Sequence, residues 1–207
     1  LTLVPLRFTL RDDPESLDMQ RLEVDLEYNA TLLLPFRFED EGTVANKVRQ
    51  ITIPVSKEEI VSNLLENPDG LDLGGAQRKV TVLMADIRGF TAIAESLEPQ
   101  RVVNLLNNYL GAMSEIIMDH NGTVDEFIGD AILAIFGAPI TRSDDTDRAI
   151  NCALAMQAAM DKINQKNRKD QLPEISMGVS LNTGAVVAGN IGSLKRTKYG
   201  VVGHTVN

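Results

Sequence analysis

Hydrophobic and charged residues alternate along the first part of the chain. A period of two with one charged face is typical of antiparallel strands that expose one face to solvent. We therefore expect a β-rich segment over residues 1–53, to which the sequence assigns no function. The alternating apolar positions are Leu6, Phe8, Leu10, Leu22, Val24, Leu26 and Tyr28, and the last four alternate with Arg21, Glu23, Asp25 and Glu27.

A short helix is predicted next, within residues 54–75. Ser56 is a suitable N-cap because Glu59 follows three positions later and Ile60, Leu64 and Leu65 share one helical face. Asn67-Pro68-Asp69-Gly70 would end this helix, and Gly74-Gly75 would supply a flexible break. We interpret residues 54–75 as a helical linker or transducer element, with a domain boundary near 68–78.

From residue 76 onward, strand and helix patterns follow each other. Residues 79–85 are almost wholly apolar, which indicates a strand covered on both faces. Helical spacing of apolar residues predicts a helix over residues 99–118. Residues 123–128 and 131–136 flank Gly129-Asp130 and predict a hairpin with a tight turn.

The last third of the chain predicts one more helix and a second hairpin. Ser143 would cap the helix, with Asp144, Asp145 and Asp147 in its first turn and Ile150, Ala153, Leu154, Met160 and Ile163 on its apolar face. Residues 174–181 and 185–188 flank Asn182-Thr183-Gly184 as a hairpin, and residues 199–202 form a last strand. The order βα(α)ββαββ predicts an α+β fold for residues 76–207, a ferredoxin-like or palm-type sandwich with helices on a mostly antiparallel sheet.

The charge is unevenly distributed. The 207 residues carry 20 basic and 29 acidic side chains, a net charge of −9, of which residues 1–78 contribute −7. No cluster of Lys or Arg appears, which argues against a nucleic acid partner. The single cysteine, Cys152, predicts a reducing, cytoplasmic location. Since the first residue is Leu1, we expect flanking sequence in which a regulatory domain or membrane anchor could lie.

Two acidic residues occupy positions suited to metal chemistry. Asp86 ends the apolar strand and precedes the turn at Gly89, and Asp130 lies at the tip of the first hairpin. If the hairpin pairs with that strand, both carboxylates converge on one site for divalent cations and the phosphates they carry. The alternative is that Asp86 is a helix N-cap and Asp130 an ordinary turn residue.

Three segments resemble the signature segments of the class III nucleotidyl cyclases, in the same order. They are VLMADIRGFT at 82–91, GTVDEFIGDA at 122–131 and YGVVGHTVN at 199–207. The resemblance covers roughly residues 76–207. Residues 54–75 also resemble the short element that often precedes the catalytic domain in bacterial members, whereas residues 1–50 resemble no family.

The resemblance implies that a nucleoside triphosphate is cyclised by attack of its 3′-hydroxyl on the α-phosphate, with release of pyrophosphate. It further implies two divalent cations, Mg²⁺ or Mn²⁺, and a homodimer with shared active sites. The family's transition-state arginine would fall four residues after Asn207, so we expect activity to require sequence beyond it. The implied roles are metal binding for Asp86, Asp130 and the carbonyl of Ile87, phosphate binding for the amides around Gly89, Phe90 and Thr91, and ribose positioning for Asn207.

Two further positions predict the base. Adenylate cyclases typically carry Lys four residues before the second metal aspartate and Asp or Thr seven residues before the asparagine, but here these residues are Glu126 and Gly200. A carboxylate accepts both guanine donors, N1–H and N2–H, but opposes adenine N1. The sequence therefore predicts a guanylate cyclase acting on GTP. The alternatives are an adenylate cyclase with an atypical base pocket and a catalytically silent cyclase-like module; a diguanylate cyclase is disfavoured because its Gly-Gly-Asp/Glu-Glu-Phe hairpin is absent.

Overall fold

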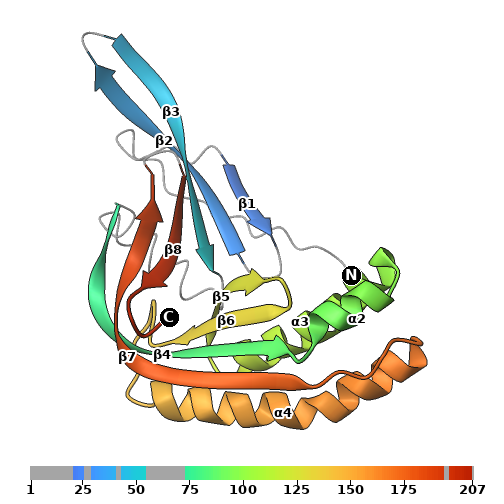
Figure 1. Ribbon diagram of the computed structural model, residues 1–207. Coiled ribbons are helices and arrows are strands. Elements are labelled where there is room, and N and C mark those ends of the chain that lie inside the picture. Colours follow the sequence, from blue (N-terminus) through green and yellow to red (C-terminus); the bar gives the residue numbers. More distant parts are fainter. Residues whose placement is uncertain (1–20, 26–28, 41–42, 55–72, 194–195, 207) are drawn as a thin grey trace.

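The computed structural model describes residues 21–25, 29–40, 43–54, 73–193 and 196–206. These residues form one eight-stranded sheet with the order β1-β2-β3-β8-β7-β4-β6-β5 (Figure 1). The helices are α2 (Phe90–Ser96), α3 (Pro99–Asp119) and α4 (Asp145–Lys169). The strands are β1 (Arg21–Asp25), β2 (Asn29–Asp40), β3 (Thr43–Pro54), β4 (Gly74–Ile87), β5 (Thr123–Ile128), β6 (Ala131–Phe136), β7 (Met177–Gly192) and β8 (Arg196–Val202).

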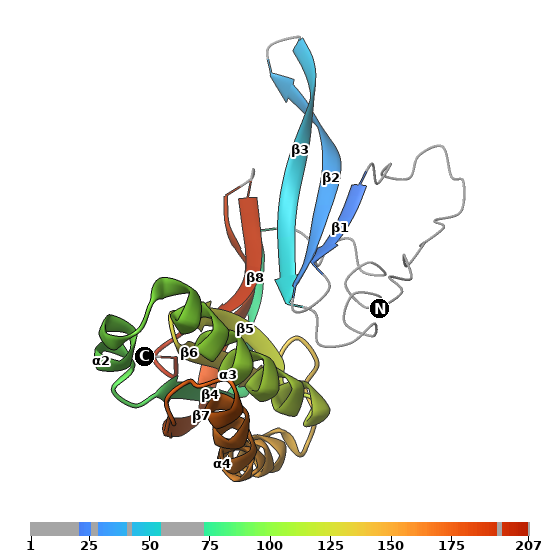
Figure 2. The ribbon, with the colours of Figure 1, turned by 90° about the vertical axis from the view of Figure 1, so that its right-hand side faces the viewer.

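Two apolar clusters lie on opposite faces of the sheet. The helices gather on one side of β4, β6 and β7 (Figure 2) and enclose the larger cluster. The smaller cluster joins β4, β6, β7 and β8 on the other face. The α+β, palm-type fold class is confirmed. The largest fully buried side chains are Tyr109, Phe136, Leu83, Leu105, Met113, Ile117, Ile132, Ile135 and Met156.

The first predicted hairpin, residues 123–128 and 131–136, is present with the predicted bounds. Most strand pairs are antiparallel. The exception among the described residues is β3, whose residues 50–52 pair in parallel with residues 196–198 of β8. The N-terminal strands therefore continue the sheet of the following residues. The helix predicted from Ser56 and the strand predicted around Phe8 lie outside the described residues, and the division at 53 and 75 stays a prediction.

The second predicted hairpin is wrong. Residues 177–192 form one continuous strand, β7, which pairs with β4 from Ile87↔Met177 to Gly74↔Asn190. The hydroxyls of Thr183 and Thr81 are 2.8 Å apart, and a Cβ at Gly184 would lie 2.5 Å from Thr205 Oγ1. Thr183 therefore makes a polar contact with β4, and Gly184 allows residues 203–206 to pack closely against β7.

Two expectations about α4 and one about the linker need correction. The N-cap is Asp144 and not Ser143. Ile150 and Leu154 are 43% and 64% exposed, so the apolar face is rotated from the predicted one. Gly74-Gly75 belongs to β4 and pairs with Asn190 and Gly189, so it is not a flexible break. The side chains of α4 that are buried and apolar are Ala149, Cys152, Ala153, Met156, Met160 and Ile163.

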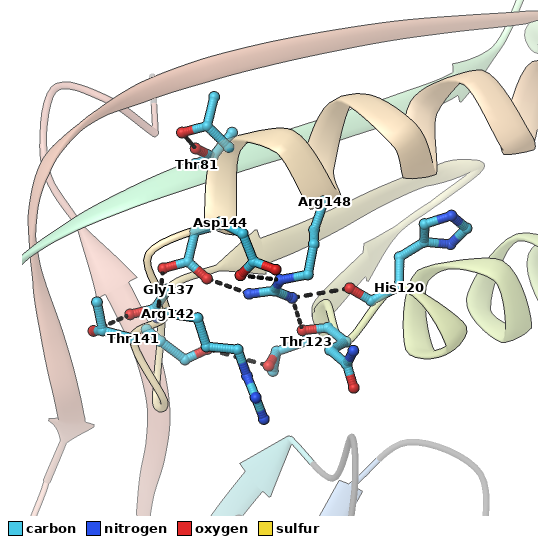
Figure 3. Close-up of polar contacts among 12 residues, drawn as sticks. Thr81, His120, Thr123, Gly137, Thr141, Arg142, Asp144 and Arg148 are labelled. Atoms are coloured by element: carbon cyan, nitrogen blue, oxygen red, sulfur yellow. Dashed lines mark hydrogen bonds and ion pairs between the residues drawn. The ribbon is translucent and has the colours of Figure 1, made fainter.

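Arg148 ties the start of α4 to the end of α3 (Figure 3). Its Nη1 donates to the carbonyls of His120 at 2.9 Å and Asn121 at 2.8 Å, and its Nε donates to Asp144 Oδ1 at 3.0 Å. Its Nη2 contacts Asp145, which is 8% exposed. These bonds satisfy carbonyls that the end of α3 leaves without helical partners.

Arg148→Ala should lower the free energy of unfolding by about 2–4 kcal/mol, because it leaves the buried Asp145 carboxylate and two carbonyls unpaired. Urea unfolding followed by circular dichroism measures the change. Arg168→Ala removes an exposed pair with Glu174 and should cost under about 1 kcal/mol. Equal costs for the two variants would contradict the role assigned to Arg148.

Candidate active site

The two candidate metal carboxylates lie at the same end of the sheet. Asp86 is the penultimate residue of β4, and Asp130 occupies the turn between β5 and β6. Because β6 pairs with β4 up to Ala85↔Ile132, the turn lies beside the end of β4. The backbone N–H of Ile87 donates to Asp130 Oδ2 at 3.0 Å. The second carboxylate is thereby fixed against the backbone that carries the first.

Tyr109 of α3 lies behind this pair. Its side chain is fully buried, and its hydroxyl has no hydrogen-bond partner among the described residues. Burial raises the pKa of Tyr109, and the negative charges of Asp86 and Asp130 raise it further. The hydroxyl therefore stays protonated, and it is a buried donor close to both carboxylates. No pattern in the sequence distinguishes it from the other apolar positions of α3.

Gly178 gives the Asp86 carboxylate its space. Gly178 of β7 pairs with Asp86 across the sheet, and a Cβ at this glycine would lie 2.7 Å from Asp86 Oδ1. A side chain here would force the carboxylate to move. Nothing in the sequence signals this role, because it depends on the register between two distant strands.

Gly178→Ala should lower kcat/KM for nucleotide cyclisation by about tenfold or more, since displacing a reacting group by about 1 Å can cost ~10²-fold. Steady-state kinetics of the intact protein measures the loss. Gly111→Ala in α3 is the matched control, because its added Cβ would meet nothing within 4 Å. Kinetics that are unchanged in both variants would contradict this role for Gly178.

The turn after Asp86 leads directly into α2. Gly89 is the N-cap and has a φ of 67°, in the left-handed region that favours glycine. An added Cβ would meet nothing within 4 Å, so the backbone conformation and not crowding accounts for the glycine. Phe90 packs against the main core, and Thr91 is exposed. The first amides of α2 have no helical acceptors, as in any helix, and so remain available to phosphate oxygens.

The two predicted base-reading positions lie near each other across the curled sheet. Glu126 of β5 has its Oε2 at 3.5 Å from Lys198 Nζ on β8, and Lys198 lies two residues before Gly200. Lys198 Nζ is also 3.8 Å from Asp125 Oδ1, and a Cβ at Gly200 would lie 3.6 Å from the same oxygen. The sequence predicts base-reading roles for Glu126 and Gly200, but no pattern in it marks Asp125 or Lys198.

These ligands suit a hard divalent cation whose coordination shell is completed by substrate and water. No group of three or more His, Cys, Asp or Glu in metal-binding geometry occurs among the described residues. Asp86, Asp130 and the carbonyl of Ile87 offer only oxygen ligands, which Mg²⁺ accepts with the remainder from water and substrate phosphates. Asn207 lies outside the described residues.

Within the described part of the chain, no helix is long and apolar enough to cross a membrane.

Residues 75–207 match the family model of the adenylate and guanylate cyclase catalytic domain. The chain belongs to the class III nucleotidyl cyclases. An adenylate cyclase of Anabaena cylindrica is 38% identical over 144 residues, which are 67% of this chain and 28% of that protein. Adenylate cyclase 1 of Rhizobium meliloti is 34% identical over 63% of this chain and 20% of its own length. The chain thus spans between a fifth and a third of these relatives.

Solved cyclases share the fold of this nucleotidyl cyclase. The guanylyl cyclase Cya2 is 51% identical, with a TM-score of 0.63 over 65% of this chain and 68% of that one. The adenylyl cyclase CyaB of P. aeruginosa is 36% identical, with a TM-score of 0.62 over 65% of this chain and 70% of that one. Both kinds of cyclase are therefore similar to this chain.

Proposed function

We propose that this nucleotidyl cyclase converts GTP to 3′,5′-cyclic GMP and pyrophosphate in a metal-dependent reaction. The observation that carries the guanine preference is Glu126, an ion-paired carboxylate at the base-reading position, with Gly200 in place of a second acidic side chain. The carboxylate accepts hydrogen bonds from N1–H and N2–H of guanine, whereas adenine presents an acceptor at N1. The 51% identity to a guanylyl cyclase also supports this choice.

In the reaction, the ribose 3′-oxygen forms a bond to the α-phosphorus and the bond to the β-phosphate oxygen breaks, so that pyrophosphate leaves. Asp86, Asp130 and the Ile87 carbonyl would hold the cations. Mg²⁺ or Mn²⁺ held there would lower the pKa of the 3′-hydroxyl and would neutralise charge on the triphosphate. The amides of Phe90 and Thr91 donate to phosphate oxygens.

Asn207 orients the ribose for attack, by the family resemblance. We further propose a homodimer in which each active site draws residues from both copies, since cyclase domains of this family act as dimers. By the family resemblance, one copy supplies the metal and base-side residues of a site and the other supplies the asparagine. Each chain carries both sets, so a homodimer has two equivalent sites.

The second candidate is an adenylate cyclase that converts ATP to cyclic AMP. It is favoured by the names of the relatives at 38% and 34% identity, which are adenylate cyclases. A catalytically silent module is a weaker candidate, because Asp86, Asp130 and Asn207 are all retained.

The intact protein should form cyclic GMP from GTP in the presence of Mg²⁺ or Mn²⁺, with a kcat/KM at least about 10²-fold above that for ATP, since ATP leaves the groups that bind the guanine edge without hydrogen-bond partners. Chromatography of the products from each nucleotide measures this ratio. Formation of cyclic AMP alone would overturn the guanine assignment, and absence of either product would favour the silent module.

A further inference from the structure

The neighbours of Glu126 extend the base site by two residues. Lys198 Nζ lies 3.5 Å from Glu126 Oε2 and 3.8 Å from Asp125 Oδ1, so that one ammonium is shared by two consecutive carboxylates. Adjacent residues of a regular strand point to opposite faces, and one lysine could not reach both. A feature of β5 must therefore turn one of them.

That feature is a β-bulge at Asp125. The pairing of β5 with β6 shifts register between Val124 and Glu126, so Asp125 is the extra residue. A bulge breaks the alternation and re-aims side chains. Asp125 is consequently turned inward, where its side chain is 7% exposed, while the side chain of Glu126 stays 54% exposed and accessible to a ligand.

Asp125 is buried and forms an ion pair with Lys198. Its Oδ1 has no hydrogen-bond partner among the described residues and lies 3.8 Å from Lys198 Nζ. Burial raises the pKa of Asp125, and the positive charge of Lys198 opposes that rise. A buried carboxylate is costly without an opposite charge nearby, so the ion pair stabilises Asp125 and restricts the position of the Lys198 ammonium.

Lys198 and Gly200 lie on the same face of β8, because they are two residues apart on one strand. A Cβ at Gly200 would lie 3.6 Å from Asp125 Oδ1, so the space left by this glycine opens onto the Asp125 carboxyl and the lysine it holds. Glu126, Lys198 and Gly200 are thus neighbours on the two strands. Lys198 makes ion pairs at 3.5 and 3.8 Å with the two carboxylates, and its ammonium has three N–H donors that can bind an acceptor on a ligand.

We infer that Lys198 reads the 6-position of the purine, donating to O6 of guanine, and that Asp125 is the positioning residue that holds it. Glu126 then accepts N1–H and N2–H, and all three polar groups on the guanine edge are satisfied. With adenine, the 6-amino group and the Lys198 ammonium would both be donors, so they could not form a hydrogen bond. This inference rests on the proposed guanylate cyclase function and adds a second discriminating contact to it.

Base analogues separate the two contacts. In 6-thio-GTP sulfur replaces O6 as a weaker acceptor, whereas ITP keeps O6 and lacks the 2-amino group read by Glu126. For the intact protein we measure kcat and KM with GTP, 6-thio-GTP and ITP. Wild type should prefer GTP over 6-thio-GTP, and Lys198→Met should lose about 10–10²-fold in kcat/KM for GTP, the value of a charged hydrogen bond, and lose that preference. Its ratio of GTP to ITP should not change.

Asp125→Asn tests the positioning role with a side chain of the same shape. It should reduce the preference for GTP over 6-thio-GTP, through KM more than kcat, and leave the GTP to ITP ratio unchanged. A merely structural ion pair would lower activity equally with all three nucleotides. Lys198→Arg, which keeps a cationic donor, should retain most of the preference, and Lys162→Met on the exposed face of α4 is the matched control.

Thermal melting identifies variants that fail to fold. Should Lys198→Met be one of them, Lys198→Leu, which also lacks a donor, replaces it, and calorimetric binding of 3′-deoxy-GTP, which cannot cyclise, replaces turnover. A folded Lys198→Met or Lys198→Leu variant that keeps the wild-type preference for GTP over 6-thio-GTP overturns this inference but leaves the guanylate cyclase intact. A wild type that makes cyclic AMP alone overturns both.

Discussion

Asp130→Asn should lower kcat of the intact enzyme by about 10³-fold, because the variant would lose a carboxylate proposed to hold the cations, and metal ions at such sites supply several kcal/mol. The fold should be retained, since an asparagine oxygen can still accept the hydrogen bond from the Ile87 N–H that Asp130 Oδ2 now accepts at 3.0 Å. Steady-state kinetics measures the loss, and thermal melting checks the fold. Mn²⁺ binding, followed by electron paramagnetic resonance, should weaken in parallel.

The matched control for this variant is Asp119→Asn, which alters an exposed aspartate at the end of α3. It should leave kcat and Mn²⁺ binding unchanged. Asp86→Asn should resemble Asp130→Asn, since both carboxylates are proposed to hold the same cations. An Asp130→Asn enzyme with near wild-type kcat would remove Asp130 from the metal site.

Glu126→Lys combined with Gly200→Asp should shift the ratio of kcat/KM for GTP and ATP by about 10²–10⁴-fold toward ATP, the range that paired polar groups achieve in discriminating ligands. The lysine donates to adenine N1, and the aspartate accepts from the 6-amino group. Product identification with each nucleotide measures the shift.

The single variants should behave differently from the pair. A Cβ at residue 200 would lie 3.6 Å from Asp125 Oδ1, an ordinary contact distance. Gly200→Asp alone, however, adds a third carboxylate beside Asp125 and Glu126, which share one lysine, and like charges repel. We expect it to be the least active variant with both nucleotides and to recover activity when Glu126→Lys is added. An unchanged preference for GTP in the double variant would show that these positions do not read the base.

Local signals in the sequence were sufficient for the elements that bring the metal carboxylates together. The apolar run before Asp86 and the Gly129-Asp130 turn predict a strand and a hairpin. Their pairing then brings Asp130 against the backbone of Ile87. The fold class follows from the same order of strands and helices, because few arrangements bury all the apolar faces.

Contacts between distant segments account for what the sequence could not predict. The local sequence predicts a turn at Thr183 and Gly184. Their partners, Thr81 and Thr205, are distant in the sequence, so no local pattern reveals these contacts. The period-two pattern likewise assigns Asp125 and Glu126 to opposite faces, and no residue preference announces the bulge that overrides it. The role of Gly178 depends on the same kind of long-range register.

The hairpin of β5 and β6 constrains how this protein can change over evolution. Glu126 and Asp130 lie four residues apart on it, with a bulge before one and a two-residue turn around the other. A one-residue insertion or deletion between them would turn one of the two side chains to the opposite face relative to the other, and so would separate the proposed base-reading residue from the proposed metal ligand. New substrate preferences can therefore arise here by substitution, while the length of the hairpin stays fixed.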